Sequence, residues 1–432
     1  MTTTHTHANL RGHLGTPLNR PLTLAIAGAG ARGAAYAHLA THLPDRARIV
    51  AVAEPRDQIR HHFATRHALP PERVYASWQD MAAAGRIADA VIIATLDADH
   101  LHPTTAFAEQ GYDILLEKPI APTLHDTEAI GEVAARTGTT IAVCHVMRYT
   151  PYTRHIKQVL PTIGDIVSIE HLEPIGANHY AHSFVRGNWR RTDEATFALL
   201  AKSCHDIDWL AYLINRPARR VSSFGSLFHF QPANRPPQAT DRCLDCPLQH
   251  TCPYSATTLY RDGLHNGGTK QYFTRVITAG QLTEDAVTTA LRDGPYGRCV
   301  YACDNDVVDH QVVNLEFDGG TTVAFTMTAF TPLENRHTKI FGTTGQLTGD
   351  GRHIHIYDFT TERTTTIDTS LDGSSTTEGH AGGDENLTRS FITALHQGQP
   401  DLILSDITNS LTSHRIVFAA EQARLTGTVI TL

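Results

Sequence analysis

Short apolar runs alternate with helix-like stretches through roughly the first 150 residues. The runs with the character of buried strands are Leu22–Ala27, Arg48–Ala53, Ala90–Thr95, Tyr112–Leu116 and Thr140–Val143. The intervening stretches, such as Gly33–His42 and Thr104–Gln110, have helical character. Strands that alternate with helices in this way predict an α/β fold with a doubly wound parallel sheet, a Rossmann domain.

The pattern changes after about residue 150, where strand-like segments dominate. These segments are Ile166–Glu173, Arg220–Phe228, Gln311–Phe317, Thr321–Thr328, His337–Phe341 and His353–Phe359. Asp318-Gly319-Gly320 is typical of a hairpin turn, and Leu210–Leu213 and Ser405–Arg424 are helical. We therefore expect a C-terminal α+β domain with a large, open, mainly antiparallel sheet.

A chain of 432 residues is too long for one compact core and suits two domains. We predict a disordered lead-in over residues 1–20, a nucleotide-binding domain over 21–150 and a second domain over 151–432. Within the second domain, a Pro- and Cys-containing segment at about 231–303 is expected to be an irregular insert.

Charge and hydropathy exclude several classes of protein. Lys plus Arg is 36 and Asp plus Glu is 44, a formal charge of −8, which argues against a nucleic-acid partner. No apolar run reaches the ~20 residues that span a bilayer, and the polar N-terminus lacks a signal core. We therefore expect a cytoplasmic protein with no membrane partner, whose cysteines are thiols or metal ligands rather than disulfides.

Gly28-Ala29-Gly30-Ala31-Arg32-Gly33 is a GxGxxG motif that follows a strand-like run and opens a helix-like one. The glycines allow a tight turn and close approach of a pyrophosphate to the helix N-terminus, so Gly28, Gly30, Ala31, Arg32 and Gly33 are predicted to bind the cofactor. Glu54 ends the second run, where a carboxylate accepts the ribose hydroxyls and repels a 2′-phosphate. NAD is therefore favoured over NADP, although Arg56 and Arg60 lie nearby and soften that preference.

Glu117-Lys118-Pro119 follows the apolar run Ile114–Leu116, and the segment Ala94–His100 lies upstream. With the glycine motif, these residues resemble the Gfo/Idh/MocA family of glucose-fructose oxidoreductases and inositol dehydrogenases. Leu96 departs from the family, which usually has Pro there. The resemblance runs from about residue 22 to the end of the chain.

The resemblance implies a Rossmann domain followed by an open antiparallel sheet, and hydride transfer between a carbinol carbon and nicotinamide. It places Thr95, His100, Glu117 and Lys118 at the cofactor. Lys118 matches the family lysine that contacts the reacting hydroxyl, and burial beside a cationic ring suits a lysine amine to pass a proton.

The family's second-domain signature has an aspartate four residues before a histidine. In the segment Ala201–Asp208, His205 matches the histidine and Ala201 occupies the aspartate position, so the usual carboxylate is absent. We predict His205 as a proton acceptor or substrate ligand and Lys202 as a second polar site residue. Asp206 or Asp309 would orient His205.

Further substrate ligands are predicted near the domain junction and in the second domain. They are Arg148, Tyr149, Arg186, Asn188, Trp189, Asp206, Asp309 and His310. Each equally suits a capping or packing role.

The insert carries Cys243-x2-Cys246-x5-Cys252, and Cys299-x3-Cys303 follows. This spacing predicts a structural zinc ion held by Cys243, Cys246, Cys252 and one of Cys299 or Cys303. His250 is a weaker candidate ligand. Free thiols and an iron–sulfur cluster are the alternatives. Cys144 and Cys204 stand apart as buried thiols.

Two functions fit these features. The first is an NAD-dependent dehydrogenase of a sugar, sugar derivative or cyclitol. The second is a glycosidase that uses retained NAD, oxidising a ring hydroxyl transiently before elimination, water addition and re-reduction. A cofactor-binding protein without catalysis is disfavoured by Lys118. Relatives of this family often form homo-oligomers, so we expect a dimer or tetramer.

Overall fold

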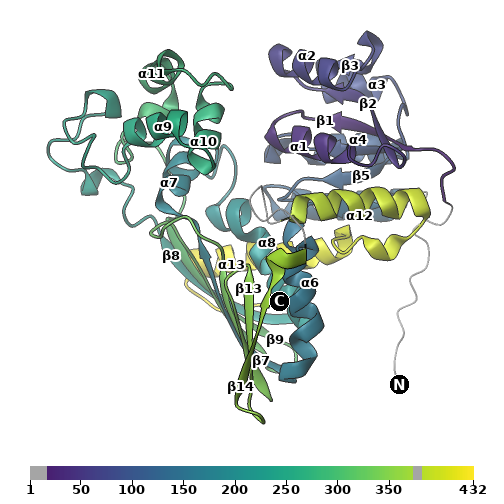
Figure 1. The fold of residues 1–432 in the computed structure, drawn as a ribbon, viewed down its shortest axis with the longest axis vertical. Helices are drawn as coiled ribbons and strands as arrows, with labels where there is room; N and C mark the ends of the chain where they lie inside the picture. Colours follow the sequence, from purple (N-terminus) through teal and green to yellow (C-terminus); the bar gives the residue numbers. More distant parts are fainter. Residues whose placement is uncertain (1–16, 373–381) are drawn as a thin grey trace.

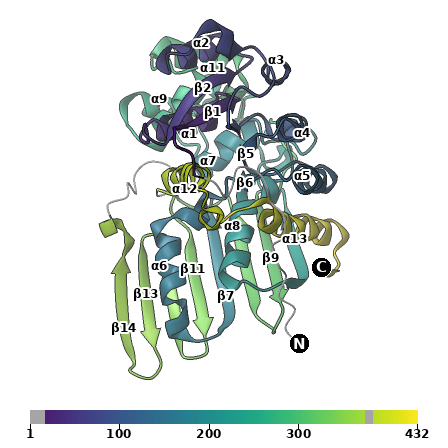
Figure 2. The same cartoon turned by 90° about the vertical axis from the view of Figure 1, so that its right-hand side faces the viewer.

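The computed structural model of the protein describes residues 17–372 and 382–432. Most of the predicted disordered lead-in, residues 1–16, lies outside the described residues. Two sheets organise the chain, one in each half (Figures 1 and 2). Among the described residues, none of the helices combines the length and apolar character needed to cross a bilayer.

The N-terminal sheet is wholly parallel, with strand order β3-β2-β1-β4-β5-β6, which confirms the doubly wound prediction. Its strands are β1 Leu22–Ala27, β2 Ala47–Ala53, β3 Val74–Tyr75, β4 Ala90–Ile93, β5 Asp113–Leu116 and β6 Ile141–Val143. The order reverses between β1 and β4. The crevice beyond the carboxyl ends of these strands is where open sheets of this type bind ligands.

Five helices accompany this sheet. They are α1 Ala31–Ala40, α2 Asp57–Arg66, α3 Trp78–Ala83, α4 Leu101–Glu109 and α5 Leu124–Thr137. The buried apolar side chains form two clusters, because alternate residues of each strand point to opposite faces of the sheet. Helix α5 shows how the sequence sets the ends: the Thr123 side chain accepts the Asp126 N–H, and Gly138 ends the helix with φ 71°.

The second sheet has nine strands in the order β14-β13-β12-β11-β7-β10-β9-β8-β15. They are β7 Ile166–Pro174, β8 Ala218–Ser226, β9 His310–Phe317, β10 Thr322–Thr328, β11 His337–Gly342, β12 Gly345–Gly349, β13 His353–Asp358, β14 Arg363–Asp368 and β15 Ile430–Thr431. Within the described part of this second sheet, only the β7–β10 pair is parallel. The predicted hairpin joins β9 to β10, and Gly319 and Gly320 take φ of 85° and 86° there.

The remaining helices outside the insert are α6 Pro151–Val159, α7 Ala177–Tyr180, α8 Ala198–Ile214, α12 Gly383–Gln397 and α13 Ile407–Thr426. Helices α6, α8 and α13 lie along one face of the nine-stranded sheet (Figure 2). Helix α12 instead packs on the N-terminal domain, where Leu387 and Phe391 share a buried cluster with Leu24 and Tyr36. The boundary at residue 150 stays a prediction, and late chain segments contribute to the core of the first domain.

The prediction of an irregular insert was wrong. Residues 231–303 contain α9 Ala256–His265, α10 Thr269–Ile277 and α11 Glu284–Asp293. Leu259, Tyr260, Phe273 and Leu291 form part of a small apolar core of their own. The prolines and cysteines between the helices interrupt the spacing of apolar residues that would otherwise predict these helices. Figure 1 places this insert beside the N-terminal domain, with both above the nine-stranded sheet.

Candidate functional site

The glycine motif forms a cradle of backbone between β1 and α1. A Cβ on Gly28 would lie 2.4 Å from the Ala94 carbonyl oxygen, and one on Gly33 would lie 1.9 Å from the Gly28 oxygen. At Gly30 a Cβ would meet only the Arg56 guanidinium, at 3.3 Å. Within the described chain, no side chain caps the start of α1 and no acidic residue stands in its first turn. The cradle therefore offers unblocked N–H groups to a phosphate.

Glu54 lies beside this cradle with only 1% of its surface exposed. Its Oε2 accepts the Ala29 N–H at 2.9 Å, and Arg56 binds both carboxylate oxygens at 2.6 and 2.9 Å. Burial would raise the pKa of Glu54, but the hydrogen bonds and charge of Arg56 hold it below its usual value. An ionised carboxylate beside a phosphate cradle fits the adenosine end of NAD.

The Arg32 side chain forms ion pairs and hydrogen bonds with other side chains of the protein. Its Nε donates to Glu117 Oε1 at 2.6 Å, and its Nη2 pairs with Asp384 of α12 at 2.5 Å. Tyr36 donates to the same Glu117 oxygen at 2.7 Å. The charge of Arg32 outweighs burial and lowers the pKa of Glu117. We infer that Arg32 acts mainly by fixing Glu117, while its backbone N–H stays with the cradle.

Lys118 follows β5 and reaches across to the second domain. Glu117 Oε2 accepts the backbone N–H of Lys118 at 2.8 Å, and Lys118 Nζ donates to the Ala201 carbonyl oxygen of α8 at 2.7 Å. The ammonium group thus meets α8 at the residue where the family signature has aspartate. The contact is made by a backbone oxygen rather than a carboxylate.

Two buried histidines hold the backbone that follows Lys118. His100 Nδ1 contacts the Pro119 carbonyl oxygen at 2.9 Å, and His414 Nε2 of α13 accepts the Ile120 N–H at 3.1 Å. His100 Nε2 is buried without a hydrogen-bond partner in residues 17–372 and 382–432. Thr95 Oγ1 donates to the Asp99 carbonyl oxygen at 2.8 Å. A buried nitrogen left without a protein partner is available to a ligand or to water, and a contact of His100 with the cofactor stays a prediction.

A charged network continues from Ala201 along α8. Lys202 Nζ lies 2.8 Å from Glu173 Oε1, and Arg336 Nε lies 2.9 Å from Glu173 Oε2. Arg336 also pairs with Asp206 and donates to His205 Nε2, the latter at 2.9 Å. Burial would raise the pKa of Asp206, but the charge of Arg336 together with hydrogen bonds from His171 and Arg336 holds it well below its usual value.

The cations of this network are the parts that reach solvent. The side chains of Arg336 and Lys202 are 21% and 16% exposed, whereas those of Glu173 and Asp206 are 5% and 0% exposed. The buried carboxylates therefore position two cations whose outer edges face outwards. Asp206 Oδ2 lies 3.8 Å from His205 Nε2, and its role in orienting His205 stays a prediction.

Three residues of this region are not predicted from the sequence. Glu173 and Arg336 stand at the ends of strand-like segments, and no local spacing links them to α8. His179 of α7 is the third, and burial followed by the charge of Lys202 lowers its pKa to about 3. Its neutral imidazole at this place could have been suspected only from the histidine-rich segment His179–His182.

Several predicted substrate ligands have structural partners instead. Arg148 forms a buried bidentate ion pair with Asp208 at 2.6 and 2.7 Å, and the Tyr149 hydroxyl lies 3.0 Å from Ser405 Oγ. These two residues tie the domain junction to α8 and to the segment before α13. Their donors are used within the protein, so the packing alternative explains them.

The other candidates divide between packing and exposure. Asp309 accepts the backbone N–H of His229 at 2.7 Å and contacts His310 Nδ1 at 2.9 Å, and its role in orienting His205 stays a prediction. Asn188 is exposed. Trp189 is 38% exposed and donates to Asp97 of the N-terminal domain at 3.1 Å, so it spans the two domains. Roles for Asn188, Trp189 and His310 in binding substrate stay predictions.

The zinc prediction is not supported. In the part of the chain that the structure describes, no three His, Cys, Asp or Glu side chains are grouped so that they could hold a metal ion. The guanidinium of Arg186 lies among the cysteines, with Nη2 3.7 Å from Cys243 Sγ, and a cation there opposes a second cation. Arg186 thus lies within the insert, and its role as a substrate ligand stays a prediction.

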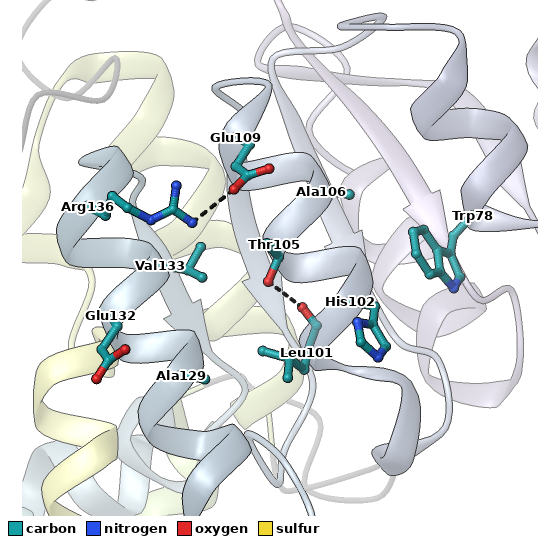
Figure 3. Close-up of a pocket in the computed structure, with 10 residues that line it drawn as sticks. All are labelled: Trp78, Leu101, His102, Thr105, Ala106, Glu109, Ala129, Glu132, Val133 and Arg136. Carbon is teal, nitrogen blue, oxygen red and sulfur yellow. Dashed lines mark hydrogen bonds and ion pairs between the residues drawn. The ribbon is translucent and has the colours of Figure 1, made fainter.

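A separate surface groove lies on the N-terminal domain between α4 and α5 (Figure 3). Arg136 of α5 reaches Glu109 of α4 at 2.9 Å across it, and Trp78 stands at its edge. None of the predicted site residues lines this groove. It has no part in the site described above.

Comparison with known proteins agrees with this geometry. The model of the oxidoreductase family with an NAD-binding Rossmann fold, GFO_IDH_MocA, matches residues 22–145, and the model of its C-terminal alpha/beta domain matches residues 157–432. The chain belongs to this family. The resemblance, the fold class and the NAD-binding character of the first domain are thereby confirmed.

Individual relatives are distant. The putative oxidoreductase YteT of Bacillus subtilis is 24% identical over 280 residues, which cover 61% of each chain. A 2,7-anhydro-N-acetylneuraminate hydratase of Escherichia coli is 23% identical over 48% of this chain and 54% of its own length. The chain thus matches only about half to three-fifths of these two relatives.

Among solved structures, the WlbA dehydrogenase of Chromobacterium violaceum in complex with NADH and UDP-GlcNAcA has a TM-score of 0.66. It is 16% identical and covers 96% of this chain and 98% of its own. This likeness shows the shared fold of the two chains.

Proposed function

We propose that the protein is an NAD-dependent oxidoreductase acting on the carbinol carbon of a sugar, sugar derivative or cyclitol. The contact of Lys118 Nζ with α8, 2.7 Å from the Ala201 oxygen, carries this proposal. It positions one amine between the dinucleotide cradle and the charged network of the second domain. Bound NAD would supply the acceptor or donor of the hydride.

The protein's own residues handle the proton and the orientation of the substrate. Lys118 would take the proton of the reacting hydroxyl, and its present partner, a carbonyl oxygen, is replaceable by that hydroxyl. Glu117, His100 and His414 fix the backbone around Lys118. His205 is the second candidate for contacting the substrate or relaying a proton, and Arg336 positions it through the contact with Nε2.

The cations of the second domain favour a substrate that carries a carboxylate. Arg336 presents a planar donor group and Lys202 a point charge, both anchored on buried carboxylates. The names of two similar proteins point the same way, since one acts on a neuraminate and the other was solved with UDP-GlcNAcA. An acidic sugar is therefore the substrate class that we propose.

A second candidate is a hydratase or glycosidase that retains NAD and uses it for transient oxidation. Ala201 favours this candidate, because the missing carboxylate weakens the usual relay for net proton release. The hydratase among the relatives also favours it. In this reaction Lys202 or His205 would serve the elimination and water-addition steps.

Nicotinamide absorbance separates the two candidates. The purified protein is mixed with NAD and a panel of acidic and neutral sugars, and reduced nicotinamide and sugar products are followed together. A dehydrogenase accumulates NADH in proportion to product. A hydratase or glycosidase forms product with no net NADH, and a protein without redox function forms neither.

The nine-stranded sheet supports a further proposal, that the protein forms a homo-oligomer, either a dimer or a tetramer. Along β8, Val221 and Ser223 are buried under helices, whereas Phe224 is 65% exposed. One face of this sheet is therefore left uncovered by the helices of the same chain. Light scattering tests this proposal, and a monomer at every concentration would contradict it.

A further inference from the structure

Two distant parts of the insert meet as a short backbone bridge. Arg242 and Arg298 pair in antiparallel fashion, and the Cys299 N–H donates to the Asp241 oxygen at 2.8 Å. Cys243 and Cys299 each follow directly after a bridged residue, so they lie on adjoining segments. Local turns then bring back Cys246 and Cys252, whose N–H groups donate to Cys243 O at 3.3 Å and Leu248 O at 2.8 Å.

These four cysteines line one cavity of about 180 Å³. Arg186 and Tyr254 line it as well. Cys303 does not line it, because its Sγ is turned to the Cys299 carbonyl oxygen at 3.3 Å. In residues 17–372 and 382–432, no three His, Cys, Asp or Glu side chains are grouped so that they could hold one metal ion.

Four cysteine thiols around one cavity are the first reason to expect a bound iron–sulfur group, because cysteine thiolates are the usual protein ligands of iron–sulfur clusters.

Arg186 supplies the second reason to expect an anionic group. It is 1% exposed, and its recorded contacts are neutral: the Arg298 oxygen at 2.7 Å, the Tyr254 oxygen at 2.8 Å and Cys243 Sγ. Its Nη1 has no hydrogen-bond partner within the described residues. A buried cation without a carboxylate is costly unless a negative group lies beside it.

We propose that Cys243, Cys246, Cys252 and Cys299 bind a [4Fe–4S] cluster in this cavity. On binding, the four thiols release four protons and form four sulfur–iron bonds. The oxidised cluster core carries two positive charges, so the ligated cluster has a net charge of −2, which Arg186 partly offsets. A cluster joins the two Cys-bearing segments and stabilises an insert whose own apolar core is small.

The test is iron and acid-labile sulfide analysis of the full-length protein, purified without oxygen. We expect about four irons and four sulfides per chain and a broad visible absorbance that bleaches with dithionite. Cys252→Ala should lose at least nine-tenths of both. Cys303→Ala, the matched control outside the cavity, should keep both.

Other outcomes overturn the proposal. One zinc per chain without sulfide would identify a single-ion site, and wild-type protein that binds neither metal after reconstitution with iron and sulfide would exclude a cluster. Equal loss of iron and sulfide from Cys252→Ala and Cys303→Ala would contradict the proposed set of ligands. If Cys252→Ala does not fold, the wild-type analysis and the Cys303→Ala protein decide the question.

Discussion

The two sides of the candidate site are built from different chemistry. The cofactor side consists of backbone, with glycines packed so closely that a Cβ on Gly33 would lie 1.9 Å from a carbonyl oxygen. The substrate side consists of charged side chains, Lys202 and Arg336, anchored on buried Glu173. Backbone geometry is common to proteins of the same fold, whereas individual side chains are replaced one at a time. In the proposed function, the first side therefore defines the reaction, and the second defines what reacts.

Replacing Lys118 tests the residue that joins the two sides. We expect Lys118→Met to lower kcat by about 10³-fold, the scale of a lost general acid–base, while NAD affinity changes little. Lys339→Met, on the exposed part of the sheet, should retain full turnover. Steady-state kinetics and calorimetric titration with NAD measure the two effects. A Lys118→Met protein with near-normal kcat would show that Lys118 takes no part in the reaction and does not link the two sides of the site.

Arg336→Gln tests whether the second side selects the substrate. We expect KM for carboxylated sugars to rise by about 100-fold relative to neutral sugars, because a bidentate charged contact is lost. Arg352→Gln, which removes an exposed ion pair with Asp368, is the control. Thermal melting identifies any general loss of stability. An unchanged ratio of the two KM values would remove Arg336 from substrate recognition.

Glu54→Gln tests the buried carboxylate beside the glycine cradle. Loss of a charged acceptor should weaken NAD binding by about tenfold and narrow the preference over NADP, because Arg56 is then released towards a 2′-phosphate. Glu109→Gln is the exposed control. Dissociation constants for both nucleotides provide the measurement. Unchanged constants would show that Glu54 supports only the turn at Ala29.

The smallest effect concerns pH. Burial lowers the pKa of His145 to about 3 and of His414 to about 4, below the ~6.5 of an unfolded histidine. Between pH ~6.5 and the lower folded-state pKa values, these histidines bind more protons in the unfolded chain than in the folded chain. Their contribution to the free energy of unfolding therefore falls as pH drops below ~6.5 and does not change with pH above it. Each histidine contributes about 1.4 kcal/mol per pH unit.

His414→Gln should remove the contribution of one histidine to the pH dependence of the free energy of unfolding, which melting curves at several pH values would reveal. His125→Gln, an exposed histidine, serves as the control. A slope below pH 6.5 that is identical in the His414→Gln protein would mean that other groups cause the acid sensitivity.

The same contrast explains what the sequence could predict. The strands of the first domain, the cradle and Lys118 follow from local spacing, because each is made by consecutive residues. The α8 residues Lys202, His205 and Asp206 were found by their motif. Arg336 and Glu173 were not, since contacts between β7, α8 and the segment before β11 depend on strand order in the second sheet.

Arginines were the hardest residues to interpret. Arg148, Arg186 and Arg336 look alike in the sequence, yet they pair with Asp208, with neutral groups beside cysteines, and with Asp206 and Glu173. Only the first and last of these have a carboxylate partner. Similarly, the helices of the insert were hidden because a short core of its own leaves few apolar repeats to detect.

We propose that this protein transfers hydride through bound nicotinamide with Lys118 as the proton carrier. Rapid mixing of the NAD-loaded protein with acidic sugars, followed by the absorbance of reduced nicotinamide, tests this directly. We expect a rise in that absorbance with at least one carboxylated sugar, sustained or transient, which slows about 10³-fold in Lys118→Met. Conversion of a sugar to product with no rise of reduced nicotinamide at any time would contradict it.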